Sequence, residues 1–215
     1  MDLLDTLRST GAVRGFTSDP VGDDTIAAIL DTARFAPSGG NRQPWRVAVV
    51  KDPSLRTTLA DLMRPVWHEY MGANAVGQRP FVYGRSIDAP PVAVPNALID
   101  GIQQVPVVLA VAANLLDIAI MDGNLDRPPV VGGASIYPFC WSIVLAARAH
   151  GLGGVMTTFL SRAEPAAAPH LGLPADHALV ATIFLGVPTH QNTKLRRNPV
   201  NSFATIDRFD GDSLS

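Results

Sequence analysis

The chain has 215 residues, which suits one domain with a sizeable core, because domains usually hold about 100–200 residues. It is 47% hydrophobic and only 17% charged, against about 25% charged in an average soluble chain, which excludes a disordered protein and indicates that an oligomer hides part of the surface. Its 17 Lys and Arg against 19 Asp and Glu leave a net charge of −2, so we expect neither nucleic acid nor a membrane as partner.

The sequence predicts a cytoplasmic protein. Cys140 is the single cysteine and has no partner for an intrachain disulfide, and the opening Met-Asp-Leu-Leu-Asp lacks the basic and apolar regions of a secretory signal. The most apolar stretch, residues 105–121, is interrupted by Pro106, Asn114 and Asp117 and falls short of the ~18 residues of a membrane span.

Two helices are predicted first. A short helix opens the chain and stops before the break at residues 9–11, and a second helix begins with Asp23 or Asp24 as its cap and ends before Pro37. The apolar residues at helical spacing are Leu3, Leu4 and Leu7 in the first helix and Ile26, Ile29, Leu30 and Ala33 in the second.

A buried strand over residues 45–50 follows, and a turn at residues 51–54 leads into a helix that carries Leu55, Leu59 and Leu62. Residues 64–104 show no steady period, and their prolines and glycines predict an irregular excursion from the core.

The second half of the chain predicts a central helix over residues 134–150, preceded by a loop at 117–133 and ended by Gly151 in the left-handed conformation. Ser161 and Glu164 form a candidate capping box for a short helix. Three further strands are expected at residues 105–113, 155–159 and 178–185. A polar, basic tail comes last, and the lack of repeats or linkers favours a single domain over the whole chain.

Common catalytic and binding motifs are incomplete. The Gly-Leu-Gly-Gly run from Gly151 has Met156 where a dinucleotide fingerprint needs its last glycine, and Ser135 lacks the second glycine of a nucleophile elbow. Cys140 lies on the apolar stripe of its helix and is expected to be a buried structural thiol. The histidines, His68, His150, His170, His177 and His190, lack metal-ligand spacing, so we expect no metal.

The most informative segment is Ala-Pro-Ser-Gly-Gly-Asn-Arg-Gln-Pro-Trp at residues 36–45. Pro37 ends a helix, two glycines allow the backbone to approach a planar ligand, and Ser38, Asn41 and Gln43 bring donors and acceptors to one turn. Such a turn suits a heteroaromatic ring with carbonyls and ring nitrogens. Spacing alone favours an ordinary helix-to-strand loop.

This segment resembles the signature of the flavin-dependent nitroreductase family. Three further stretches occur in the order that this resemblance requires. Residues 12–17 resemble its Arg-containing phosphate motif, residues 146–154 its Gly-Leu-Gly turn beside the flavin, and residues 185–199 its closing strand and basic tail. The resemblance covers nearly the whole chain apart from residues 64–104.

The resemblance implies an α+β fold with a central, mostly antiparallel sheet flanked by helices, in an intertwined homodimer with FMN at the subunit interface. It further implies hydride transfer from NADH or NADPH through flavin N5 to a planar electrophile such as a nitroaromatic or a quinone, with the hard chemistry carried by the flavin and no dedicated catalytic residue. Alternatives are another reaction on the same scaffold, such as reductive dehalogenation or flavin cleavage, and a flavin-storage protein with little turnover.

The resemblance also assigns site residues. The cofactor-binding set is Arg14, Pro37, Ser38, Gly39, Asn41, Gln43, Gly153, Gly154, Val155, Arg196 and Arg197, and we expect Trp67 and Phe81 to line the substrate side. Family members usually carry further basic residues where this chain has Gly11 and Gly15. Phosphate binding is therefore expected to depend mainly on Arg14 and the tail.

Overall fold

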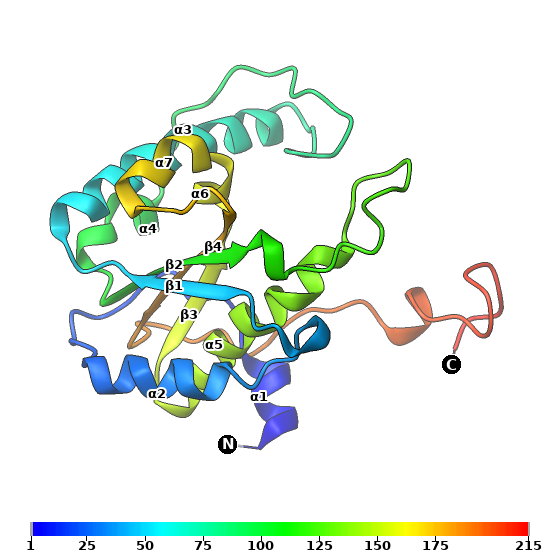
Figure 1. Cartoon of the computed structure of the whole chain (residues 1–215), viewed down its shortest axis with the longest axis horizontal. Helices are drawn as coiled ribbons and strands as arrows, with labels where there is room; N and C mark the ends of the chain where they lie inside the picture. The colour runs from blue at the N-terminus through cyan, green and yellow to red at the C-terminus, as the bar shows by residue number, and fades with distance from the viewer. Residues whose placement is uncertain (1, 215) are drawn as a thin grey trace.

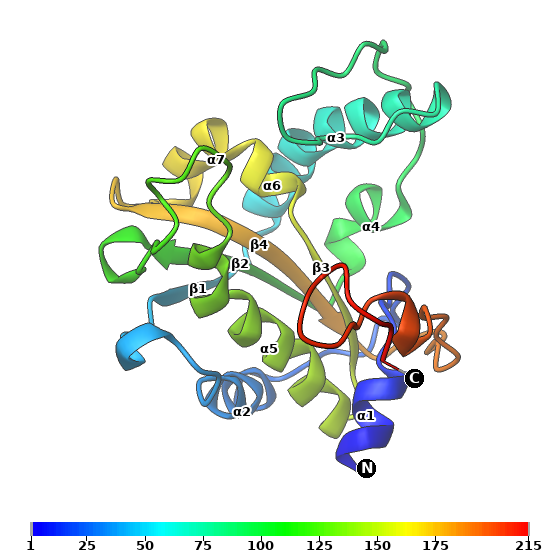
Figure 2. The ribbon, with the colours of Figure 1, turned by 90° about the vertical axis from the view of Figure 1, so that its right-hand side faces the viewer.

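The computed structural model describes residues 2–214, and its centre is a four-stranded antiparallel sheet in the order β1-β2-β4-β3 (Figures 1 and 2). The strands are β1 (Trp45–Val49), β2 (Val107–Asn114), β3 (Gly153–Thr157) and β4 (His177–Gly186). With helices on both faces, the fold is of the α+β class with an antiparallel sheet, as the sequence predicts.

The helices form two layers, one on each face of the sheet (Figure 1). α2 (Asp23–Ala33) and α5 (Tyr137–Ala149) cover one face, with α1 (Leu3–Ser9) against the end of α5. The other face carries α3 (Pro53–Ala75), α4 (Ala97–Asp100), α6 (Phe159–Arg162) and α7 (Glu164–Leu171). Short 3₁₀ turns lie at Gly39–Asn41, Ile102–Gln104, Leu115–Asp117, Val131–Ser135 and Val200–Ser202.

Successive side chains of β2 point to opposite faces of the sheet, so this strand contributes to the hydrophobic core on each face. Val107 and Leu109 pack toward α2 and α5, whereas Val108 and Ala110 pack toward α3, and all four are buried. No helix among residues 2–214 has both the length and the apolar character needed to cross a bilayer.

The prediction of a buried first strand is wrong in its burial. β1 forms at residues 45–49 but lies at the edge of the sheet, paired on one side only, with Arg46, Ala48 and Val49 exposed. An apolar run is compatible with a central or an edge strand, and only the pairing order, which is a non-local property, decides between them.

The prediction of an irregular excursion over residues 64–104 is wrong in its first part. α3 continues to Ala75 through Pro65, whose ring faces solvent, because Met63, Val66 and Ala73 keep a buried stripe on the helix. Tertiary burial outweighs the one backbone hydrogen bond that the proline removes. Residues 76–96 are irregular, as expected, whereas the last part of the segment is again helical, with α4 and the 3₁₀ turn at Ile102–Gln104.

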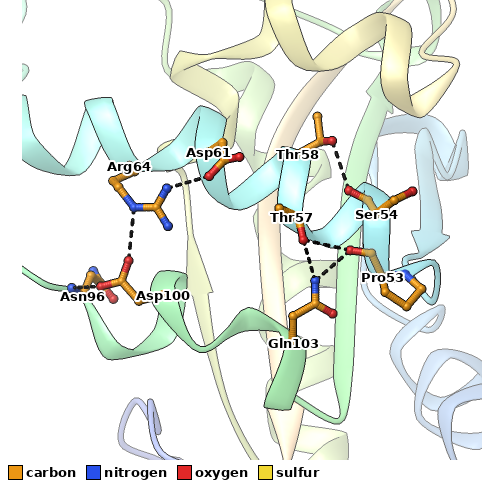
Figure 3. A network of polar contacts seen from close by, with 9 residues as sticks. All are labelled: Pro53, Ser54, Thr57, Thr58, Asp61, Arg64, Asn96, Asp100 and Gln103. Atoms are coloured by element: carbon orange, nitrogen blue, oxygen red, sulfur yellow. Dashed lines mark hydrogen bonds and ion pairs between the residues drawn. The ribbon is translucent and has the colours of Figure 1, made fainter.

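Polar contacts attach α4 and the turn after it to α3 (Figure 3). Arg64 bonds Asp61 on its own helix at 2.6 Å and Asp100 of α4 at 3.2 Å. The Gln103 amide donates to the Pro53 carbonyl at 2.7 Å and to the Thr57 hydroxyl at 2.8 Å. These bonds attach to α3 the chain that follows Asn96, a residue that lines a cavity described below.

Two predicted caps are also wrong. α2 is capped by the backbone of Gly22, and Asp23 and Asp24 lie inside its first turn, where the helix dipole favours carboxylates. Ser161 lies within α6, and the Glu164 carboxylate accepts from the backbone N–H of Leu179 on β4, so neither forms a capping box. Asp23 and Glu164 each form a tertiary contact in place of the predicted local one, Asp23 with Lys51 at 2.6 Å and Glu164 with Leu179.

Candidate flavin-nucleotide site

The amino-terminal segment that carries Arg14 lies between two other parts of the chain. The Val13 N–H donates to the Gly154 carbonyl of β3 at 3.0 Å, and the Thr17 N–H donates to the Val187 carbonyl after β4 at 2.9 Å. Arg14 is thereby held at the free edge of β3, and its side chain is exposed.

Gly11 and Gly15 are required by the packing of the segment after β4. A Cβ on Gly11 would lie 2.6 Å from the Asn192 carbonyl oxygen and 2.9 Å from a Leu195 methyl, and a Cβ on Gly15 would lie 2.8 Å from the Thr189 hydroxyl. A basic side chain at these positions would displace residues 189–195. The same contact brings the start of the basic tail beside the Arg14 segment.

A cavity of about 600 Å³ opens next to Arg14, between β3, α3 and α4. Its aromatic wall consists of Trp67, Tyr70 and Phe159, with the Trp67 and Tyr70 rings stacked at 5.8 Å and the Phe159 ring edge-on to both. The wall suits a planar ring system, because aromatic faces stack favourably in offset or edge-on contact. The other lining residues are Met63, Asn96, Leu98, Ile99, Met156, Thr157, Thr158 and Phe184.

The chemistry of this cavity fits a flavin mononucleotide. Arg14 offers a guanidinium at its margin, which is the usual partner of a phosphate. The Thr157 hydroxyl in the same wall is buried and has no hydrogen-bond partner among residues 2–214. Buried polar groups are normally bonded, so this hydroxyl is available to a ligand with carbonyls or ring nitrogens.

Gly153, Gly154 and Val155 lie on β3 beside this cavity, but the two glycines are required by packing within the chain. A Cβ on Gly154 would lie 2.4 Å from a Leu185 methyl and 2.8 Å from the Phe184 carbonyl oxygen, and one on Gly153 would lie 2.7 Å from Val13. Val155 points its side chain into the core under α3. Any contact of these residues with a cofactor would therefore use the backbone.

The turn at residues 37–43 satisfies many of its own polar groups. The Ser38 hydroxyl accepts from the Gln43 N–H at 3.0 Å, and the Gln43 side-chain amide donates to the Asn41 side chain at 3.2 Å. The Gly39 N–H donates to the Ser135 hydroxyl at 3.0 Å, which attaches the turn to the start of α5. Asn41 and Gln43 both have positive φ, so the turn has a specific and locally strained shape.

The structure does not bring this turn to Arg14 within one chain. β1, which follows the turn, and β3, beside Arg14, are opposite edges of the sheet (Figure 2). Trp45 is level with Ala178 of β4, whereas Gly154, to which the Val13 N–H donates, is level with Leu185. With three inter-strand spacings across and about seven residues along, the two groups lie roughly 25 Å apart.

The remaining predicted site residues lie in different parts of the structure. Arg196 and Arg197 are exposed in the tail, with the Arg197 guanidinium bonded to the Arg196 carbonyl at 2.7 Å. Trp67 lines the cavity with Arg14, whereas Phe81 lines a neighbouring one. The sequence reasoning missed Tyr70 as part of the aromatic wall, together with Asn96, Thr157 and Phe159. The Thr-Thr-Phe run at residues 157–159, shortly after Gly153 and Gly154, was the sequence signal that could have indicated two of these residues.

The expected structural role of Cys140 is confirmed. The thiol is fully buried on α5, and this burial raises its pKa to about 12, so the reactive thiolate is suppressed at neutral pH. Among residues 2–214, no group of three or more His, Cys, Asp or Glu side chains is placed to hold a metal ion.

The fold is of the α+β class, with an antiparallel sheet between two helical layers and an aromatic-walled cavity beside an arginine at one edge of the sheet. The chain belongs to the Nitroreductase family, whose model matches residues 7–187.

Curated relatives and solved structures agree with this membership. The chain is 30% identical over 189 residues to a 5,6-dimethylbenzimidazole synthase of Rhodospirillum rubrum, covering 84% of this chain and 79% of the relative. It is 28% identical to an NADH dehydrogenase of Thermus thermophilus, covering 88% of each. In fold it resembles an NADPH:FMN oxidoreductase of Vibrio harveyi, with TM-score 0.70 and 18% identity over 96% of this chain and 77% of that one.

Proposed function

We propose that this protein is an FMN-dependent oxidoreductase that passes hydride from NAD(P)H to a planar electrophile such as a nitroaromatic or a quinone. The observation that carries the proposal is the cavity beside Arg14, which combines an aromatic wall, an unpartnered buried hydroxyl and a cation at its margin. Family membership and the likeness to a relative named NADH dehydrogenase support it.

FMN, when bound, would supply hydride acceptance and donation at its N5 atom. The protein's part is to bind and orient. In this proposal Arg14, with Arg196 and Arg197 of the adjoining tail, neutralises the phosphate, and Thr157 donates a hydrogen bond to the ring. Trp67 and Tyr70 restrict the ring to one plane and exclude water from that side.

The roughly 25 Å between Arg14 and the Ser38–Gln43 turn leads us to propose a homodimer in which the turn of one subunit completes the cavity of the other. Exposed apolar side chains offer the interface. Trp141 and Tyr137 on α5 are 39% and 42% exposed. Leu116 and Met121, in the loop between β2 and α5, are 75% and 85% exposed. Isolated large apolar groups are common on surfaces, but this many on adjoining elements is typical of an interface.

The test of the function is spectroscopic. We expect the purified protein to be yellow, to release FMN and not FAD on denaturation, and to lose its absorbance near the flavin maximum when NADH or NADPH is added without oxygen. Bleaching followed by rapid recovery with a quinone or nitroaromatic supports the proposal. A protein that binds FMN but is not reduced is a storage protein, and one that cannot be reconstituted with FMN contradicts the assignment altogether.

The dimer has its own test. Light scattering at low micromolar concentration should return twice the chain mass. A Ser38→Trp variant, which blocks the turn, and an Arg14→Ala variant should each bind FMN poorly alone, whereas a mixture of the two should regain part of the binding, because mixed dimers contain one intact site. An active, flavin-loaded monomer would contradict the shared site.

Synthesis of 5,6-dimethylbenzimidazole is a second candidate, favoured by relatives of that name at 30% identity. The dimethylbenzene ring of this product is also part of the flavin, so flavin cleavage is the reaction that this candidate implies. Chromatography of an aerobic incubation with FMN and NAD(P)H decides between them. Accumulation of the benzimidazole with loss of FMN supports the second candidate, and intact FMN supports the first.

A further inference from the structure

A second cavity, of about 580 Å³, lies between the end of α3, α6 and the segment of residues 81–89. It meets the flavin cavity at two aromatic rings, since the Tyr70 ring of the first cavity lies 6.4 Å from the Phe81 ring of the second. A substrate stacked on the flavin in the first cavity is therefore within reach of the second cavity.

The charged lining of this cavity is unbalanced. Arg85 and Arg162 face it with Glu69 as the one carboxylate, so one positive charge is in excess. The Arg162 guanidinium lies 3.7 Å from Glu69, too far for a hydrogen bond, and 5.4 Å above the Phe81 ring. Neither arginine side chain donates a hydrogen bond to any residue between 2 and 214. The N–H donors of both guanidinium groups are therefore available to a ligand.

The wall of the cavity is held in place from several sides. The Val92 N–H donates to the His68 carbonyl at 3.0 Å, and the Asp88 N–H donates to the Gln78 side chain at 3.2 Å. A Cβ on Gly72 would lie 2.2 Å from the Pro90 carbonyl oxygen, so the segment packs directly on the α3 backbone. Binding would not need to order the segment, which lowers its entropic cost.

We infer that this cavity binds the anionic group, a carboxylate or a phosphate, of a substrate whose planar ring stacks against the FMN held in the flavin cavity. The inference rests on the proposed function. Arginine forks bind carboxylate and phosphate oxygens in a bidentate manner, which fixes orientation as well as charge. The anion has two sources, a carboxylate on the electron acceptor or a phosphate of the nicotinamide nucleotide.

The acceptor arm of the test compares 4-nitrobenzoate with 4-nitrobenzamide, two planar molecules of almost equal shape that differ in charge. Wild type should favour the carboxylate in kcat/KM, and Arg162→Gln and Arg85→Gln should each lower that preference by about tenfold, the effect of one lost charge-assisted hydrogen bond. Arg79→Gln is the matched control, because Arg79 is exposed two residues before the 81–89 segment and does not line the cavity.

The nucleotide arm measures flavin reduction by NADPH and NADH in rapid mixing. If Arg162→Gln and Arg85→Gln weaken NADPH binding about tenfold and leave the acceptor preference unchanged, the cavity binds a phosphate. If both variants match Arg79→Gln in both arms, the inference is overturned.

A binding measurement without turnover separates this inference from the proposed function. Calorimetry should show 4-nitrobenzoate binding to the purified protein that weakens in Arg162→Gln, with unchanged thermal unfolding of the variant. If binding depends on Arg162 but NAD(P)H does not reduce the protein, the proposed function is wrong and the inferred anion binding stands. If turnover is normal and depends on neither arginine, the inferred anion binding is wrong and the proposed function stands.

Discussion

The backbone N–H of Val13 donates to the carbonyl of Gly154 at 3.0 Å, which makes the amino-terminal segment a neighbour of the sheet edge at β3. The interaction joins residues 141 positions apart in the chain. It fixes Arg14 at the margin of the aromatic cavity, whose other walls come from the middle of the chain. The arginine that we propose binds phosphate and the aromatic wall that we propose binds the ring therefore line one cavity.

Replacing Arg14 by Ala should weaken FMN binding by about 1.5–3 kcal/mol, the range for a hydrogen bond to a charged group. Arg197→Ala should have a smaller effect, since Lys194 and Arg196 are close in sequence. Titration of the flavin-free protein with FMN, followed by flavin fluorescence, measures both. Arg8→Ala, an exposed change on α1, is the control, and equal affinity in Arg14→Ala and the control would show that the amino-terminal motif does not bind phosphate.

Gly154→Ala should lower the free energy of unfolding by about 1–3 kcal/mol, the usual cost of overpacking, because its Cβ would lie 2.8 Å from the Phe184 carbonyl oxygen. Gly132→Ala is the control, with no atom nearer than 3.4 Å to the new Cβ. Chemical denaturation of the flavin-free protein at one fixed concentration measures both. Normal stability with lost FMN binding would mean that Gly154 serves the approach of the cofactor instead.

The sequence allows local structure to be predicted better than the position of the site. The stripe of Ile26, Ile29 and Ala33 predicts α2 because a helix forms from neighbours in sequence. The place of β1 at the sheet edge and the distance between Arg14 and Ser38 depend on strand order, which local patterns do not contain.

Resemblance supplied the candidate motifs, and Trp67 was the one member of the aromatic wall that the sequence assigned to the site. Tyr70 lies on a helix that the sequence predicts to end before Pro65, so its stacking on Trp67 follows only from the folded path of α3. The glycines of β3 illustrate a second limit. A glycine needed for strand packing and one needed for ligand approach have the same letter, and only neighbouring atoms distinguish them.

Asp122 should make stability depend on acid pH. Its carboxylate is buried and accepts from the Val130 N–H at 2.9 Å and from Arg127 at 2.6 Å, and these bonds lower its pKa. A lowered folded-state pKa stabilises the protein above the unfolded value of about 3.9, and this contribution is lost as pH falls through the folded pKa.

Asp122→Asn should therefore be less stable than wild type at neutral pH, and the difference should shrink below about pH 4. Denaturation curves between neutral and acid pH measure this, with Asp126→Asn as the exposed control on the same loop. The loop contacts the Ser38 turn around a cavity of about 250 Å³, so FMN binding should weaken in parallel. A pH-independent difference would assign the loss to packing.

The last prediction separates the two half-reactions of the proposed enzyme at Phe81 and Trp67. Phe81 is 40% exposed beside Tyr70, so Phe81→Ala should lower kcat/KM for aromatic acceptors about two- to tenfold, the value of a lost aromatic contact, while flavin reduction by NAD(P)H changes less. Trp67 also donates from its indole N–H to the Val94 carbonyl at 2.7 Å, so Trp67→Ala should impair both half-reactions by releasing the segment. Stopped-flow absorbance measures each half separately, with Tyr83→Ala, a 74% exposed ring on the same segment, as the control. Equal losses in both halves for Phe81→Ala would show that its ring supports the fold and that acceptor selection resides elsewhere.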